Sequence, residues 1–169
     1  MIETSRLLLR EYTLEDVPSL NRIQSDPITM KFWASPFTEE HSRNWIERAI
    51  ASYAANGFGR WALLLKETNA QIGDAGLMRV EVNGNPEVDL GYILQADRWQ
   101  KGYATEAALA ILRFGKEKGL PRMIAHMAHD HTKSQRVAER LGMRKETEFV
   151  NPRNRNIVHS LYAWNAPRS

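Results

Sequence analysis

One segment of this sequence constrains the fold more than any other: residues 87–94 have the pattern of a buried strand, and a helix begins only a few residues later, near Gly102. Gly102 and Ala104 keep side chains small where that helix starts, so a ligand can approach the backbone. Free amide groups and the positive end of the helix dipole make such a turn a site for phosphate. The alternative left open by the turn alone is an ordinary amphipathic helix with Ala107 and Ile111 facing the core.

The rest of the chain alternates between helix and strand signals. Thr13 with Asp16, and Thr38 with Glu39 and Glu40, are typical helix starts, and residues 83–86 are strong turn residues. The expected strands are 6–12, 61–67, 72–82, 87–94, 123–128 and two more after 142; the expected helices are 13–24, 38–56, 102–118 and 133–141. The order β, α, α, β, β, β, α, β, α, β, β predicts one α/β domain, residues 1–169, with a mixed sheet.

Composition narrows the functional classes. The chain has no cysteine, which excludes disulfides, thiolate zinc sites and a cysteine nucleophile. It has no signal-peptide pattern and no apolar run near the roughly 20 residues of a membrane span, so we expect a cytoplasmic protein without a membrane partner. The 23 Lys and Arg residues against 20 Asp and Glu are spread along the chain, which suits a small polyanionic ligand better than nucleic acid.

Several motifs in this order resemble the GNAT superfamily, and within it the branch of Rim-type ribosomal-protein N-acetyltransferases. They lie at residues 4–10, 25–27, 72–73, 90–92, 102–107, Ser134 and 141–143, so the resemblance covers nearly the whole chain. It implies a GNAT fold, with a mixed, mostly antiparallel sheet whose two central strands splay apart for coenzyme A. It also implies direct transfer of an acetyl group from acetyl-CoA to a primary amine, without a metal.

The resemblance assigns a coenzyme site. Backbone amides of Gln100, Lys101, Gly102, Tyr103, Ala104 and Thr105 would hold the pyrophosphate, with Trp99 standing where the family usually has Gln or Arg. The pantetheine arm would lie between strands 87–94 and 123–128, along Ile93 and Leu94. Gly91 suits a bulge or a close backbone approach there. His131 stands where the family usually has Asn.

Catalytic roles are less tightly defined. By resemblance, a backbone amide around Tyr92 meets the developing oxyanion, and the Ser134 hydroxyl approaches the coenzyme sulfur; a helix cap is the alternative for Ser134. Asp89 is the candidate for accepting the amine proton, and a surface-exposed or ion-paired Asp89 is its alternative. His126 is the second candidate base. The spacing of the histidines does not suggest a metal site.

The acceptor remains open at the level of sequence. Phe32, Trp33 and Phe37 are expected either to line its site or to pack in the core, and the polar stretch 151–156 is expected to be a loop beside it. Three functions are consistent with these residues: acetylation of a protein N-terminus, acetylation of a small amine, and a non-catalytic acyl-CoA sensor. The oligomeric state is open as well, with a homodimer as one candidate.

Overall fold

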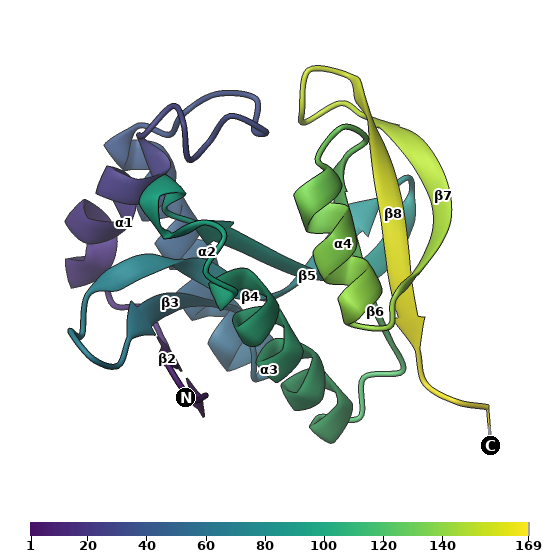
Figure 1. Cartoon of the computed structure of the whole chain (residues 1–169), viewed down its shortest axis with the longest axis horizontal. Helices are drawn as coiled ribbons and strands as arrows, with labels where there is room; N and C mark the ends of the chain where they lie inside the picture. Colours follow the sequence, from purple (N-terminus) through teal and green to yellow (C-terminus); the bar gives the residue numbers. More distant parts are fainter. Residues whose placement is uncertain (169) are drawn as a thin grey trace.

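The computed structural model describes residues 1–168, which form one eight-stranded sheet in the order β1-β2-β3-β4-β5-β6-β8-β7 with helices on its faces (Figure 1). The strands are β1 (Ile2–Glu3), β2 (Leu7–Arg10), β3 (Arg60–Leu65), β4 (Gln71–Val82), β5 (Asn85–Leu94), β6 (Arg122–Ala128), β7 (Arg144–Asn151) and β8 (Ile157–Asn165). The helices are α1 (Val17–Gln24), α2 (Glu39–Asn56), α3 (Tyr103–Glu117) and α4 (Thr132–Arg140), with 3₁₀ turns η1 (Leu14–Asp16) and η2 (Ala96–Arg98).

The predicted α/β fold and the order of its main elements are confirmed, with two local differences. β1 has only two residues, too few for a periodic pattern, and was not predicted. The helix expected at 13–24 is divided into η1 and α1, because Pro18 has no N–H to donate to the carbonyl of Leu14. The capping box of Thr13 and Asp16 is present at the start of η1.

Helix α2 begins and ends where its capping residues predict. The Thr38 side chain accepts a hydrogen bond from the His41 amide, and Gly57 has the left-handed conformation, with φ of 73°, that ends many helices. Ile46 and Ala49 are buried, whereas Ile50 is 37% exposed, so the buried stripe of this helix passes through Ala49 and not through its neighbour Ile50.

The sheet separates at its centre. β4 and β5 pair continuously from Gly73↔Leu94 to Val82↔Asn85, whereas β5 and β6 pair in parallel only at Asp89↔Ile124. Figure 1 shows the two resulting halves: β2–β5 with α1, α2 and α3, and β6–β8 with α4. The expected splay of the two central strands is confirmed.

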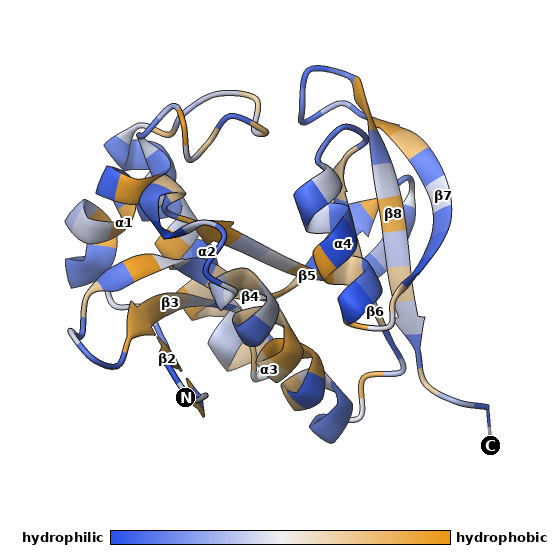
Figure 2. Cartoon of the chain, viewed as in Figure 1, coloured by the Kyte–Doolittle hydropathy of each residue, from blue (hydrophilic) through white to orange (hydrophobic). Residues whose placement is uncertain are grey.

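Alternation along β5 gives its two faces different surroundings. Val88, Leu90 and Leu94 pack in the main core with residues of α3, while Ile93 packs on the opposite face against Ile23 and Met30. β3 is buried along its whole length and is almost uniformly hydrophobic, and α3 shows apolar and polar stripes (Figure 2). β5 therefore presents side chains to both faces of the sheet.

Candidate active site

A cavity of about 1080 Å³ occupies the splay and is lined by residues from both faces of β5. Its walls come from the 29–37 loop, α2, β5, the turn before α3, β6, α4 and the β7–β8 turn. All the predicted site residues line it except Lys101: Phe32, Trp33, Phe37, Asp89, Tyr92, Ile93, Leu94, Gln100, Gly102, Tyr103, Ala104, Thr105, His131 and Ser134. The structure thus brings the two halves of the predicted site into one space.

The turn before α3 presents unused amide donors. Among the described residues, no backbone N–H of residues 100–105 donates a hydrogen bond to a protein acceptor, whereas the Glu106 amide donates to the Gly102 carbonyl at 3.0 Å. Gln100 and Gly102 both have positive φ, 62° and 81°, which turns the backbone of this segment toward one side. Such a set of amides at the start of a 15-residue helix suits a pyrophosphate.

Two side chains that were given no role by the sequence fix this turn. The Arg6 guanidinium donates to Glu106 Oε2 at 2.7 Å and to the Lys101 carbonyl at 2.9 Å, and it lies 4.4 Å from the centre of the Tyr103 ring. Glu106 also accepts from the Thr4 hydroxyl at 2.6 Å. The Thr4–Arg6 segment was part of the recognised motif, and these contacts give it a structural function.

Trp99 explains how the loop tolerates the absence of the usual Gln or Arg. Its indole N–H donates to the Leu94 carbonyl at 2.7 Å, so the ring ties the turn to the end of β5. Lys31 lies 5.3 Å from the centre of the same ring. A backbone phosphate site does not depend on the side chain at this position.

Tyr92 and Ser134 meet on the face of β5 that is covered by α3 and α4. Their hydroxyls are 2.9 Å apart, and either oxygen can donate. Burial raises the pKa of the Tyr92 phenol, and the bond to Ser134 partly opposes that effect. Sequence reasoning gave Tyr92 only a backbone role, and the spacing of 42 residues offered no signal for this contact.

Asp89 lies on the opposite face of the same strand, toward α2. One carboxylate oxygen, Oδ1, is buried without a hydrogen-bond partner in the described chain. Burial raises the pKa of Asp89, while the nearby His126 and Arg60 lower it and Glu87 raises it further. A carboxylate in these surroundings can take a proton nearer to neutral pH than an ordinary aspartate.

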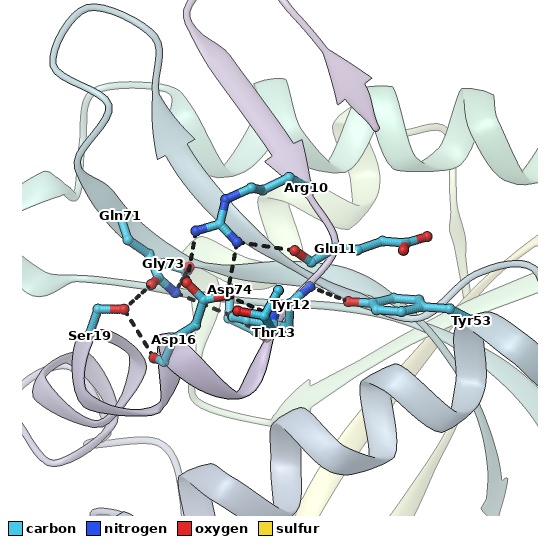
Figure 3. Close-up of polar contacts among 10 residues, drawn as sticks. All are labelled: Arg10, Glu11, Tyr12, Thr13, Asp16, Ser19, Tyr53, Gln71, Gly73 and Asp74. Carbon is cyan, nitrogen blue, oxygen red and sulfur yellow. Dashed lines mark hydrogen bonds and ion pairs between the residues drawn. The ribbon is translucent and has the colours of Figure 1, made fainter.

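Beneath this part of the cavity lies a buried ion pair. Arg60, which is 5% exposed, donates a hydrogen bond to the fully buried carboxylate of Asp74. Asp74 also accepts hydrogen bonds from the Tyr12 hydroxyl at 2.8 Å and from the Trp45 indole at 3.0 Å (Figure 3 shows Tyr12 and Asp74). A Cβ on Gly91 would overlap the Arg60 guanidinium. The bulge suggested for Gly91 is therefore wrong, since β4 and β5 pair without interruption there; glycine is needed for a side chain that passes close to the strand.

The aromatic loop contributes both to the core and to the wall of the cavity. Trp33 and Phe37 pack against the small core of Ile23, Met30 and Ile93, and both also line the cavity. Phe32 stacks on His131 with ring centres 3.7 Å apart, which joins this loop to the start of α4. The same side chains therefore pack in the core and form an apolar wall of the cavity.

His131 replaces the usual Asn with a ring that is held flat against Phe32. It precedes α4 but its side chain does not cap the helix, and burial lowers its pKa to about 4. The ring is therefore neutral near pH 7 and can donate one hydrogen bond. No group of three or more metal-binding side chains occurs in residues 1–168, and no helix in that range is long and apolar enough to cross a membrane.

Comparison with known proteins agrees with this geometry. Residues 6–144 match the family model of the acetyltransferase (GNAT) domain. The chain is 31% identical over 150 residues to the uncharacterized N-acetyltransferase YnaD of Bacillus subtilis, covering 88% of this chain and 85% of that one.

Solved structures show the same fold. An acetyltransferase of the GNAT family from Bacillus anthracis superposes with a TM-score of 0.81 at 29% identity, covering 97% of each chain. RimL, a ribosomal L7/L12 alpha-N-protein acetyltransferase solved in complex with coenzyme A, has a TM-score of 0.80 at 16% identity, with 96% of this chain and 95% of that chain covered. The family match over residues 6–144, together with the splayed sheet and the amide-rich turn, shows that this chain belongs to the GNAT family of acetyltransferases.

Proposed function

We propose that this enzyme transfers the acetyl group of acetyl-CoA directly to a primary amine that reaches the site from the α1–α2 face of the sheet. One observation carries the proposal: Asp89 and the Tyr92–Ser134 pair lie on opposite faces of β5 and line the same cavity. Proton removal from an amine and proton donation to a thiolate need separate groups on the two sides of the reacting carbon.

The coenzyme would bind on the α3–α4 side. The free amides of residues 100–105 suit its pyrophosphate, and the gap beside Ile93 and Leu94 suits its amide-rich pantetheine arm. RimL binds coenzyme A in its crystal structure, which supports the same ligand class in this fold. His131, neutral and facing the cavity, offers one donor to that arm where the family usually has an amide.

Backbone alternation identifies the amides that are free to stabilise an oxyanion. The Gln95 amide donates to Ile72 of β4, so the amides of Ile93 and Gly91 point toward β4 as well. Those of Tyr92 and Leu94 then point into the gap, where β5 has no paired strand. They are the donors that we propose for the thioester carbonyl oxygen.

Side chains on the two faces of β5 complete the reaction. Asp89, through its unpartnered Oδ1, would accept a proton from the acceptor's ammonium group, directly or through water, and leave a neutral amine that attacks the thioester. The Ser134 hydroxyl, supported by Tyr92, would donate to the departing thiolate. A sensor without catalysis would need neither a partly desolvated carboxylate nor this hydroxyl pair.

The remaining assignments are proposals of the same kind. The Rim-type resemblance supports a protein N-terminus as one acceptor, and the aromatic wall of Trp33 and Phe37 suits a small amine with an apolar portion as the other. We propose one domain that acts in the cytoplasm, because a chain without cysteine has no feature that needs an oxidising compartment.

The test follows thiol release from acetyl-CoA across a panel of primary amines. We expect stimulation by some amines and an acidic limb in the pH profile of kcat/KM that lies above the ordinary Asp range of about 3.9, since burial raises the pKa of Asp89. Asp89→Asn should abolish that limb and lower turnover. Thiol release that no amine stimulates would refute the proposal and favour a sensor; an unchanged limb in Asp89→Asn would refute the base.

A further inference from the structure

A chain of hydrogen bonds runs from the aromatic loop to the floor of the acceptor side. Asn154 Nδ2 lies 2.9 Å from the Phe32 carbonyl oxygen and 2.9 Å from His159 Nε2. His159 Nδ1 lies 3.0 Å from His126 Nδ1. Asn154 and His159 are only 5% and 6% exposed, so water does not compete freely for these bonds.

The proton positions along this chain follow from its two ends. A carbonyl oxygen can only accept, so the atom of Asn154 that faces Phe32 must be the amide nitrogen. That nitrogen carries two protons, and the second is directed at His159 Nε2, which must therefore accept. Neutral His159 then carries its proton on Nδ1 and donates it to His126 Nδ1.

Because His126 Nδ1 accepts this hydrogen bond, a neutral His126 ring must carry its proton on Nε2. Burial, with further contributions from His126 and His129, lowers the pKa of His159 to about 4, so the ring stays neutral near pH 7 and the order of donors is kept. His126 Nε2 has no protein partner among residues 1–168, and His126 lines the cavity. The cavity therefore receives an N–H donor from this residue.

Asp89 supplies the complementary group. It pairs with Ile124 across the β5–β6 junction, and His126 is the next residue of β6 on the same face. Its Oδ1 atom is a buried acceptor without a partner in the described chain. One donor and one acceptor from adjacent strands thus face the same part of the cavity.

We propose that His126, fixed as the Nε2–H tautomer by Phe32, Asn154 and His159, is a specificity-determining donor that binds an oxygen of the acceptor while Asp89 binds its amine. The acceptor class is a primary amine with a carbonyl or hydroxyl oxygen on the neighbouring carbon, which an amino-acid amide and a peptide N-terminus share. This inference rests on the proposed amine acetylation. It also excludes His126 as the base, because the nitrogen that faces the cavity already carries a proton.

The tautomers are measurable without any turnover. Long-range ¹H–¹⁵N spectra of the full-length protein near pH 7 should show His126 protonated on Nε2 and His159 on Nδ1. Asn154→Asp removes the amide donors, so His159 should become protonated on Nε2 in that variant. Asn156→Asp, an exposed change in the same turn, should leave both rings unchanged and control for the added charge. His126 protonated on Nδ1 in the unmodified protein would overturn the proposal.

Selectivity is tested with two amines, alaninamide and sec-butylamine, the second lacking the oxygen. The kcat/KM for alaninamide divided by that for sec-butylamine should fall about three- to tenfold in His126→Leu, because one hydrogen bond is lost. The ratio should be largely kept in His126→Gln, whose amide keeps an N–H near the Nε2 position. Comparing each ratio with that of the unmodified enzyme cancels the different basicity of the two amines. A ratio that is unchanged in His126→Leu would overturn the role in specificity.

The two levels of inference fail in different ways. If neither amine is acetylated, that result counts against the proposed function, and the His126 Nε2–H resonance becomes the readout: alaninamide should shift it and sec-butylamine should not. Equal shifts with both amines would refute the specificity role of His126, whatever the activity assay shows. A tripeptide amide of alanine, compared with alaninamide, separates a peptide N-terminus from a small amine within the class.

Discussion

The buried pair of Arg60 and Asp74 should dominate the stability of the acceptor side, and Asp74→Asn tests it. Asp74 is fully buried and accepts hydrogen bonds from Tyr12, Trp45 and Arg60 at once. An asparagine of the same size has one acceptor oxygen instead of two and adds an N–H that faces other donors. The Arg60 charge would then remain buried without its counterion.

The expected loss follows from that uncompensated charge. Removing one partner of a buried ion pair costs about 3–5 kcal/mol. For a chain of 169 residues, 1 kcal/mol corresponds to about 2–4 °C in Tm, so the variant should melt about 6–20 °C lower. Urea unfolding should give the same loss from the shift in midpoint, with an unchanged m value.

An exposed ion pair provides the control. Lys145 and Glu148 are 2.7 Å apart, with side chains 47% and 50% exposed, and solvent screens an exposed pair of this kind so that it contributes little to stability. Glu148→Gln should therefore leave the Tm and the urea midpoint nearly unchanged. If Asp74→Asn costs no more than Glu148→Gln, the assignment of Asp74 as the essential counterion is wrong.

Three further substitutions test the coenzyme side. Gly102→Glu should lower coenzyme A affinity, measured by calorimetry, at least about tenfold, because it adds negative charge beside the free amides. Gly119→Glu is the control, since Gly119 has a similar φ of 74° at the far end of α3, and it should leave the affinity unchanged. Equal losses of affinity in both variants would indicate general damage to the protein. Ser134→Ala should lower turnover by at most about 10²-fold with little change in coenzyme affinity. Tyr92→Phe should show a smaller effect of the same kind. Unchanged turnover with a lower Tm in Ser134→Ala would make Ser134 merely structural.

Local signals predicted the parts of this protein that depend on neighbouring residues. Thr38 and Gly57 mark the ends of α2 because capping uses atoms within one turn. The amide-rich turn at Gly102 could be predicted for the same reason. The first amides of a helix have no partner within the helix, and this does not depend on where the helix packs in the fold. Resemblance then supplied the splay between strands 87–94 and 123–128, which no local pattern contains.

Contacts between distant segments could not be predicted in this way. Arg6 and Glu106 are 100 residues apart, and Tyr92 and Ser134 are 42 apart. Gly91 shows the difficulty most clearly: its glycine signal was correct, but its cause is Arg60, a residue from another strand. The sequence shows that space is needed at such a position without showing what occupies it.

The different roles that we propose for Asp89 and Tyr92 follow from their spacing on one strand. Side chains of a strand alternate between faces, so two residues three apart must point to opposite sides. At a strand that borders a gap in the sheet, both faces open into the same cavity, as they do here. In the proposed mechanism, odd spacing therefore separates a carboxylate on the acceptor side from a hydroxyl on the thiolate side while both line the same cavity. Moving either group by one residue would place both on one face and leave the other side of the reaction without a proton-transfer group.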